Sequence, residues 1–285
     1  MKYLIFGGYG ALGEDVFNKL QVEGHTIVRI SRDKAGLDSN SKFIDLTDEK
    51  SLIEINLEGY DRILYLAQSR NYKDPSNNYN EIMCVNHRAP ILLAEKAFSL
   101  SIPFLYASTG SVYENSASAL QEEDPVRTEG PQSLYVTSKI ATEMKFRELP
   151  NVKMIRPFYM FGKKSRVEML IPAIMEKVKK DMPIHIGEGG GFHFNPISTM
   201  DAAEATVAVF QGEHKIVNIA GDEVITIEHL AKLIGEVIYK IPKIEKVKEP
   251  SSQSIADIRK LTSLGFQFKY GLNQRIIDFV KAYKN

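Results

Sequence analysis

The sequence predicts an α/β fold, in which a doubly wound parallel sheet is followed by a smaller C-terminal α/β lobe. Three observations lead to this prediction. Short runs of β-branched and aromatic residues alternate with longer helix-like stretches through the first half of the chain. The strand-like runs are apolar almost throughout, which is typical of parallel strands covered on both faces. A glycine-rich turn, FGGYGALG (6–13), joins the first strand to the first helix.

The first half contains strand-like runs with helical patterns between them. The strands are expected at KYLIF (2–6), TIVRI (26–30), RILYLA (62–67), IPFLYAS (102–108) and VKMIR (152–156). The helices are expected at about 11–23, 48–57, 81–99 and 133–148. Strands that alternate with helices in this way predict strand–helix–strand units and a parallel sheet.

The second half changes character. A helix is expected around 167–180, before the glycine-rich and weakly periodic segment MPIHIGEGGGFHFNPIS. The remaining elements expected are a helix at about 201–211, a strand at 215–220, a helix capped by Thr226 and a helix after Gly271. We therefore predict a first domain over 1–162 and a C-terminal lobe over 163–285 that partly returns to the first domain.

The composition is that of an ordinary globular protein, with 44% hydrophobic and 25% charged residues. Lys and Arg together number 36, as do Asp and Glu, so no net field attracts nucleic acid or an anionic membrane. The single cysteine, Cys84, excludes an internal disulfide and fits a reducing cytosol. No apolar run approaches the roughly 20 residues that span a bilayer, and MKYLIF reads as a first strand rather than a signal peptide. We expect a cytoplasmic protein.

The glycine-rich turn carries the strongest functional signal. Gly7, Gly10 and Gly13 give the spacing G-x-x-G-x-x-G, one residue wider than the usual dinucleotide fingerprint. Glycine allows the tight backbone angles of such a turn and the close approach of a pyrophosphate. The helix that opens with Ala11 and Leu12 offers free N–H groups and a partial positive charge. On the first strand–helix turn of a parallel sheet, this motif predicts a Rossmann-like dinucleotide-binding domain over 1–162.

The end of the second strand bears on the choice of cofactor. An acidic side chain near this position usually holds the ribose of a cofactor that lacks a 2′-phosphate. The sequence RISRD places Ser31 and Arg32 there instead, and Arg32 could pair with a 2′-phosphate. Asp33 follows directly, so a shifted register would restore the acid. NADP is therefore favoured, and NAD stays open.

Two further motifs, STGSVY and YVTSK, follow the glycine turn in order. With them the chain resembles an extended short-chain dehydrogenase/reductase of the nucleotide-sugar epimerase/dehydratase/reductase type, over nearly its whole length. The resemblance implies that Asp45 and Leu46 flank the adenine and that Ala67 and Gln68 pass the ribose and phosphates. It also implies that Asn86 lies near the nicotinamide, that residues 163–285 bind the substrate, and that the protein forms a homodimer.

Tyr135 and Lys139 stand four residues apart, so a helix would place them on one face. A free tyrosine has a pKa near 10, and a nearby ammonium group or an oxidised nicotinamide favours the phenolate. The resemblance implies that Lys139 also bonds the nicotinamide ribose, while Thr109, or its neighbour Ser108, holds the substrate oxygen. Tyr135 would then exchange a proton as hydride passes between substrate and nicotinamide.

The motif STGSVY lacks an acidic residue, and this limits the reactions that the protein could catalyse. In related dehydratases the residues after the catalytic threonine include an acid, but here they are Gly110 and Ser111. Neither can act as a strong general acid or base, which argues against dehydratase and decarboxylase chemistry. A 4-epimerase and a keto-sugar reductase remain, and Arg32 tilts the choice toward the reductase. A non-catalytic NADP-binding sensor or scaffold also stays open.

The substrate side departs from the family pattern. Tyr159 and Phe194 occupy positions where many relatives carry an asparagine and an arginine that contact the sugar diphosphate. Lys163 could supply the missing positive charge or could be a solvated helix-entry lysine. His185 and His193 could each touch the substrate or simply be exposed. The scattered histidines and the single cysteine show no metal-ligand spacing.

Overall fold

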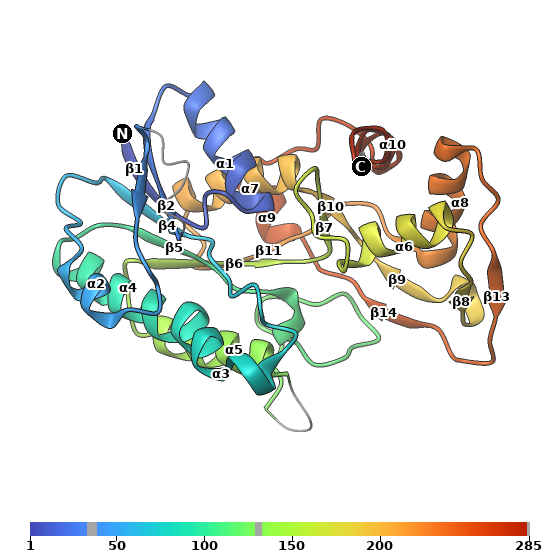
Figure 1. Cartoon of the computed structure of the whole chain (residues 1–285), viewed down its shortest axis with the longest axis horizontal. Helices are drawn as coiled ribbons and strands as arrows, with labels where there is room; N and C mark the ends of the chain where they lie inside the picture. Colours follow the sequence, from blue (N-terminus) through green and yellow to red (C-terminus); the bar gives the residue numbers. More distant parts are fainter. Residues whose placement is uncertain (33–38, 129–132, 284–285) are drawn as a thin grey trace. The chain divides into compact units, whose positions relative to one another are not determined.

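The computed structural model describes residues 1–32, 39–128 and 133–283 (Figure 1). The chain divides into two compact units. Unit 1 comprises Met1–Glu114, Pro125–Arg156 and Thr206–Val217, and unit 2 comprises Asn115–Asp124, Pro157–Ala205 and Asn218–Asn285. Unit 2 thus takes in Asn115–Asp124 from the first half of the chain, and unit 1 takes back Thr206–Val217. Within the described ranges, no helix combines the length and the apolar character needed to cross a bilayer.

A seven-stranded sheet organises unit 1, in the order β11-β6-β5-β4-β1-β2-β3. Its strands are β1 (Lys2–Phe6), β2 (Thr26–Ser31), β3 (Ser41–Phe43), β4 (Arg62–Tyr65), β5 (Phe104–Ala107), β6 (Val152–Pro157) and β11 (Ile216–Ile219). All pairs from β3 to β6 are parallel, which confirms the predicted fold class. The strand order runs outward in both directions from neighbouring β1 and β4. This is the switch point at which doubly wound sheets bind their ligands, beyond the carboxyl ends of the strands.

Helices cover both faces of this sheet, with α1 on one face and α4 and α5 on the other (Figure 1). The helices are α1 (Ala11–Val22), α2 (Glu49–Glu54), α3 (Pro75–Met83), α4 (Ala89–Ser99), α5 (Leu134–Phe146) and α7 (Thr199–Gln211), the last shared by the two units. The single helix expected over 81–99 was wrong in two respects: the helical segment begins earlier, at Pro75, and it is not one continuous α-helix. A π-helical turn, η1 (Cys84–Arg88), separates α3 from α4.

The π-helical turn depends on Pro90 and on two hydroxyls from separate strands. Pro90 lies in the first turn of α4 and has no N–H to donate to the carbonyl four residues back, which belongs to Asn86. The N–H of Ala89 bonds to Cys84 instead, so the Val85 carbonyl is also released. Both carbonyls instead accept hydrogen bonds from tyrosine hydroxyls of the sheet. Tyr65 Oη donates to Val85 O at 2.5 Å, and Tyr106 Oη donates to Asn86 O at 2.9 Å.

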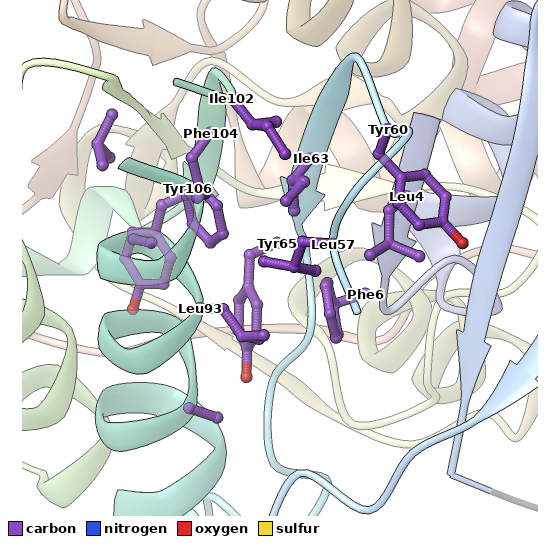
Figure 2. Close-up of a cluster of buried hydrophobic side chains, with 14 of the residues drawn as sticks. Leu4, Phe6, Leu57, Tyr60, Ile63, Tyr65, Leu93, Ile102, Phe104 and Tyr106 are labelled. Carbon is purple, nitrogen blue, oxygen red and sulfur yellow. The ribbon is translucent and has the colours of Figure 1, made fainter. Parts of the chain in front are cut away.

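The same tyrosines form the aromatic core of unit 1 (Figure 2). Phe6, Tyr65 and Tyr106 occupy matching register positions at the ends of β1, β4 and β5. The ring centroids of Phe6 and Tyr65 are 5.5 Å apart, and those of Tyr65 and Tyr106 are 6.1 Å apart. Phe146 of α5 meets Tyr106 edge-on at 5.1 Å. Each such pair contributes about 0.5–1.5 kcal/mol beyond area burial, so the carboxyl ends of three strands are held together with α5.

Unit 2 has its own core, formed by the apolar faces of α6 (Leu170–Lys179), α8 (Ile227–Ile238) and α10 (Leu272–Ala282). Thr226 Oγ1 accepts from the N–H of His229 at 3.1 Å, which confirms the predicted cap of α8, and α10 begins after Gly271 as predicted. The sequence did not reveal the short strands of this unit. They are β7 (Met160–Phe161), β8 (Ile184–Ile186), β9 (Phe192–Phe194), β10 (Ile197–Ser198), β12 (Ile225–Thr226), β13 (Ile244–Lys246) and β14 (Ser252–Ser254).

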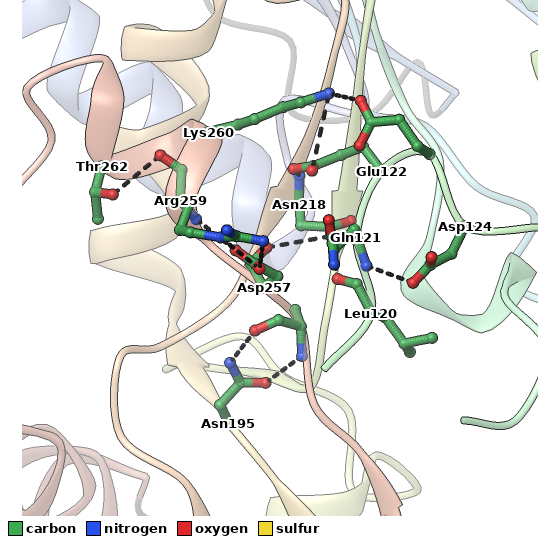
Figure 3. Close-up of polar contacts among 12 residues, drawn as sticks. Leu120, Gln121, Glu122, Asp124, Asn195, Asn218, Asp257, Arg259, Lys260 and Thr262 are labelled. Atoms are coloured by element: carbon green, nitrogen blue, oxygen red, sulfur yellow. Dashed lines mark hydrogen bonds and ion pairs between the residues drawn. The ribbon is translucent and has the colours of Figure 1, made fainter. Parts of the chain in front are cut away.

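A buried polar network holds the segment Asn115–Asp124 inside unit 2, next to the start of α9 (Arg259–Ser263) (Figure 3). The backbone N–H of Asn218 donates to Glu122 Oε1 at 2.8 Å, and the Asn218 side-chain Nδ2 donates to Leu120 O at 2.9 Å. Burial raises the pKa of Glu122, and Lys260 Nζ lies 3.9 Å from its carboxylate. These contacts explain why a segment of the first half belongs to the second unit.

Candidate active site

The glycine turn lies at the switch point of the sheet. Gly7 has φ +82°, and a Cβ there would lie 2.6 Å from the backbone nitrogen of Ala67, beyond the end of β4. A Cβ on Gly13 would overlap the Gly7 carbonyl oxygen. The N–H of Gly10 closes the turn on Gly7 O at 3.0 Å. Backbone packing therefore requires glycine at positions 7 and 13. The turn also brings Gly7, which follows β1, next to Ala67, which follows β4.

The start of α1 fits the pyrophosphate of a dinucleotide. Gly10 takes the N-cap position in extended conformation, and no side chain among the described residues caps the helix there. Ala11 begins the helix, while Leu12 and Gly13 face the protein interior. The N–H groups of the first turn are therefore presented at the loop, where an anion would satisfy them. The binding of a pyrophosphate at this turn stays a prediction.

The other residues predicted to bind cofactor have different surroundings. Arg32 follows β2 and is exposed, whereas Asp33 lies outside the described residues. Asp45 Oδ1 accepts from the Thr47 N–H at 2.8 Å and from its hydroxyl at 2.7 Å. Leu46 and Ala67 are partly buried against the core of unit 1, and Gln68 is exposed beyond β4. Their contacts with a cofactor stay predictions.

Tyr135 and Lys139 lie one turn apart on α5, which begins after Ser133. The hydroxyl of Ser133 accepts from the Val136 N–H at 3.3 Å, so it caps the helix. Tyr135 is half-buried and Lys139 is 1% exposed. Lys139 Nζ donates to Ala107 O at 2.7 Å and lies 4.6 Å from the centre of the Tyr106 ring. The lysine is thus held against the end of β5.

Burial lowers the pKa of Lys139 to about 7, although the Glu143 carboxylate acts in the opposite direction. An unfolded lysine has a pKa near 10.4. Between about pH 7 and pH 10 the unfolded chain therefore binds more protons at this site, so stability rises with pH there. Below pH 7 both states are protonated, and the full cost of burying the charge is present.

Lys139→Met should therefore stabilise the ligand-free protein most below pH 7. Its advantage over the wild type should shrink toward pH 10, by up to about 1.4 kcal/mol per pH unit. Urea unfolding of both proteins from pH 6 to pH 9.5 measures this difference. Lys50→Met is the matched control, because the Lys50 side chain is 80% exposed. A difference that does not change with pH would show that Lys139 does not bear this charge cost.

Asn86 connects three elements around Tyr135. Its Oδ1 accepts from the Ser69 N–H at 3.0 Å, and its Nδ2 donates to Ser138 Oγ at 3.3 Å. Ser138, which lies between Tyr135 and Lys139, donates in turn to Tyr135 O at 2.8 Å. Asn86 is fully buried in the π-helical turn. The side chain therefore ties the end of β4 to the first turn of α5.

Thr109 and Ser108 follow β5, directly after the carbonyl that Lys139 binds. Thr109 Oγ1 accepts from the Ser111 N–H at 3.2 Å and caps a short 3-10 helix, Gly110–Val112. The Ser108 hydroxyl is buried and has no hydrogen-bond partner among the described residues. An unpaired buried hydroxyl is costly, so a ligand oxygen at this point would relieve that cost.

The predicted substrate residues of the C-terminal half lie in unit 2. Tyr159 has φ +30°, a conformation uncommon for residues other than glycine, and its ring meets those of Phe192 and Phe194 at 5.4 and 5.2 Å. Phe194 is fully buried, and its uncharged ring has no donor with which to replace an anion-binding arginine. Lys163 is exposed. Of the two histidines, His185 pairs with Glu245 at 3.3 Å and His193 Nδ1 lies 3.1 Å from Gly191 O.

Sequence reasoning missed the polar residues that support Tyr135 and Lys139. Glu143, one further turn along α5, pairs with Arg156 of β6 through contacts of 3.0 and 2.5 Å. Both side chains are almost fully buried. The spacing of Glu143 from Lys139 was the available signal, because it continues the same helix face. Ser69 and Ser138 carried no such signal, since their role depends on the fold.

The fold and this site define a doubly wound dinucleotide-binding protein with a tyrosine–lysine pair. The family model described as "NAD dependent epimerase/dehydratase family" matches residues 3–220. The chain therefore belongs to that family, which confirms the resemblance found in the sequence. Among curated proteins, it is 25% identical over 175 residues to the probable low-salt glycan biosynthesis reductase Agl14 of Haloferax volcanii. That match covers 60% of this chain and 57% of the relative.

Solved structures share the fold at low sequence identity. The UDP-glucose 4-epimerase of Thermotoga maritima, in complex with UDP-glucose, has a TM-score of 0.83 and 22% identity, over 99% of this chain and 98% of that chain. The dTDP-glucose 4,6-dehydratase DesIV of Streptomyces venezuelae, with NAD bound, has a TM-score of 0.81 and 18% identity, over 99% and 97%. Because an epimerase and a dehydratase both share this fold, with TM-scores of 0.83 and 0.81, the reaction has to be argued from the site.

Proposed function

We propose that the protein is an NAD(P)-dependent oxidoreductase that transfers hydride at a ring carbon of a nucleotide-activated sugar, C4 by preference, with keto-sugar reduction favoured over 4-epimerisation. The observation that carries this proposal is the buried Lys139 one turn from the half-buried Tyr135, with its ammonium group bonded to Ala107 O, directly before Ser108 and Thr109 in the chain. The reductase from Haloferax volcanii and the solved epimerase support the two versions of the reaction.

Each residue has a distinct task in this proposal. A bound nicotinamide supplies the hydride acceptor or donor. Tyr135 gives or takes the proton at the substrate oxygen, and Thr109 holds that oxygen within reach. Lys139 would bond the ribose and, in its charged form, favour the Tyr135 phenolate, while a phenolate would in turn favour the lysine cation. Asn86 holds the backbone of α5 at Tyr135 through Ser138.

The argument against water elimination rests on the turn after Thr109. Gly110 is buried and has no side chain, and Ser111 is exposed with its N–H bonded to Thr109. Elimination requires a general acid or base beside the reacting carbon, and neither residue provides one. We therefore propose that the protein neither dehydrates nor decarboxylates its substrate.

Unit 2 would bind the rest of the substrate in this proposal. The exposed Lys163 is the candidate contact for a diphosphate, and Tyr159 is a candidate contact for the sugar. The positive φ of Tyr159 supports its proposed contact with the sugar, because left-handed conformations at residues other than glycine often mark functional sites. A homodimer is proposed on the resemblance alone.

The exposed position of Arg32 after β2 supports NADP as the preferred cofactor, although the dehydratase DesIV contains NAD. Arg32→Ala should weaken NADP binding by about 1.5–3 kcal/mol, since a charge-assisted contact to the 2′-phosphate is lost. NAD binding should be nearly unchanged. Calorimetric titration of both cofactors into both proteins measures this. Equal losses would show that Arg32 does not read the phosphate.

The reaction is tested by incubating the protein with oxidised and reduced cofactors and a panel of nucleotide hexoses and nucleotide 4-keto-6-deoxy sugars. Products are read by mass spectrometry and by NMR of the ring protons. A gain of two hydrogens matched to loss of NADPH identifies a reductase, and an unchanged mass with inverted C4 identifies an epimerase. Loss of water would contradict the argument from Gly110 and Ser111. Cofactor binding without any turnover would favour a sensor or scaffold.

A further inference from the structure

Tyr135 lies where a helix restrains its residues least. It is the second residue of α5, and the first N–H groups of a helix have no partner within it. A proton donor must nevertheless hold its oxygen within hydrogen-bond reach of the reacting group. The Ser138 hydroxyl fixes the Tyr135 carbonyl, but it does not fix the ring. Another contact must therefore orient the phenol.

An aromatic ring from a different element makes that contact. Tyr72, in the turn between β4 and α3, lies with its ring centre 5.0 Å from that of Tyr135 and tilted by 54°. Offset or tilted ring pairs at 4.5–7 Å are favourable arrangements. Tyr72 is half-buried, and at this distance its ring limits how far the Tyr135 ring can rotate.

The loop that carries Tyr72 is itself firmly held. Glu81 of α3 accepts from Ser69 Oγ at 2.8 Å through Oε1 and from Asn71 Nδ2 at 2.6 Å through Oε2. The Asn71 N–H donates to Ser69 Oγ at 3.1 Å, and the Asp74 N–H donates to Asn71 O at 2.9 Å. Tyr72 therefore projects from a loop that is bonded on both sides of it.

We propose that Tyr72 is a positioning residue for the proton donor, acting through its ring on Tyr135. This inference rests on the proposed role of Tyr135. Among the described residues, a polar link runs from Asn86 through Ser138 to the helix backbone at Tyr135, and an aromatic link runs from the Glu81-bonded loop to the Tyr135 ring. The Tyr72 hydroxyl is not needed for this task, but an aromatic ring is.

The test compares Tyr72→Leu with Tyr72→Phe, using Tyr79→Leu as the control for loss of a tyrosine ring from neighbouring α3, where Tyr79 is 55% exposed. Tyr72→Leu should lower kcat about tenfold or more with little change in KM, because a misplaced catalytic group slows the chemical step. Tyr72→Phe should restore most of kcat. In a Tyr135→Phe background, Tyr72→Leu should cause no further loss, because its effect passes through Tyr135.

A second measurement does not depend on turnover. In the ligand-free protein with labelled tyrosines, NMR should show cross-relaxation between the Tyr72 and Tyr135 ring protons. If Tyr72→Leu does not fold, Glu81→Ala, which loosens the loop, should also lower kcat and weaken this signal. The inference is overturned if Tyr72→Leu raises only KM, or if its kcat equals that of Tyr79→Leu. It is also overturned if Tyr72→Leu lowers the kcat of Tyr135→Phe by the same factor as it lowers that of the wild type. Normal turnover in Tyr135→Phe alone would instead overturn the proposed function.

Discussion

Tyr135→Phe should lower turnover by about 10²–10⁴-fold, the usual contribution of positioned acid–base catalysis, while cofactor still binds. The change deletes one oxygen and keeps the ring, so the 5.0 Å contact with Tyr72 can persist. The helix is capped by Ser133, and the Lys139 bond to Ala107 involves no atom of Tyr135. The fold should therefore be unchanged. Steady-state kinetics on the identified substrate and cofactor titration measure the two effects separately.

Tyr79→Phe is the matched control for this substitution, because Tyr79 is a 55% exposed tyrosine on α3. It should leave turnover, cofactor binding and unfolding unchanged. If Tyr135→Phe retained near-normal kcat, another group would have to be the acid. A parallel loss of cofactor binding would mean that Tyr135 serves the cofactor site as well as the proton transfer.

Glu143→Ala should lower the free energy of unfolding by about 3–5 kcal/mol, the largest stability effect that we expect from a single substitution. The reason is that the substitution leaves the charged Arg156 without its carboxylate partner. The Arg156 side chain is fully buried, its guanidinium is bonded to both carboxylate oxygens of Glu143, and it lies 4.6 Å from the centre of the Tyr113 ring. Without the carboxylate, this buried charge has neither its ion-pair partner nor contact with water, which is costly. Urea unfolding of the variant and the wild type measures the loss.

Two companion variants sharpen this result. Glu148→Ala removes an exposed carboxylate close to the end of α5 and should change stability by less than about 0.5 kcal/mol. Replacing Glu143 by leucine together with Arg156 by methionine should recover most of the loss, because apolar pairs often substitute for buried ion pairs. A small loss in Glu143→Ala would mean that water or another acceptor reaches Arg156.

Much of this architecture could be predicted from the sequence, because its signals are local. Strand and helix periodicity gave the parallel sheet, and the glycine spacing gave the turn that packs on Ala67. The four-residue interval placed Tyr135 and Lys139 on one helix face. The signal for each of these lies in residues close together in the chain, although the turn itself packs on the distant Ala67, so pattern and propensity are sufficient to predict them.

The remainder depends on contacts between distant residues. The π-helical turn requires Pro90 together with the hydroxyls of Tyr65 and Tyr106, which come from separate strands. The support of Tyr135 by Tyr72 likewise joins residues more than sixty positions apart, without any motif. Unit 2 captures Asn115–Asp124 through Glu122 and Asn218, which lie far apart in the sequence. Periodicity carries no information about such partners.

The π-helical turn at Cys84–Arg88 also constrains how the chain can change by insertion or deletion. Successive residues of an α-helix are rotated by about 100°, so deleting one residue here would turn α3 relative to α4 by about that angle. Glu81 would then leave the loop that it bonds, and Asn86 would leave both Ser69 and Ser138. The core beneath α4 would be preserved, since that helix would not need to move. A shortened chain would thus remain folded but lose its catalytic geometry, so the length of the segment from α3 to α4 is a condition for activity in addition to its side chains.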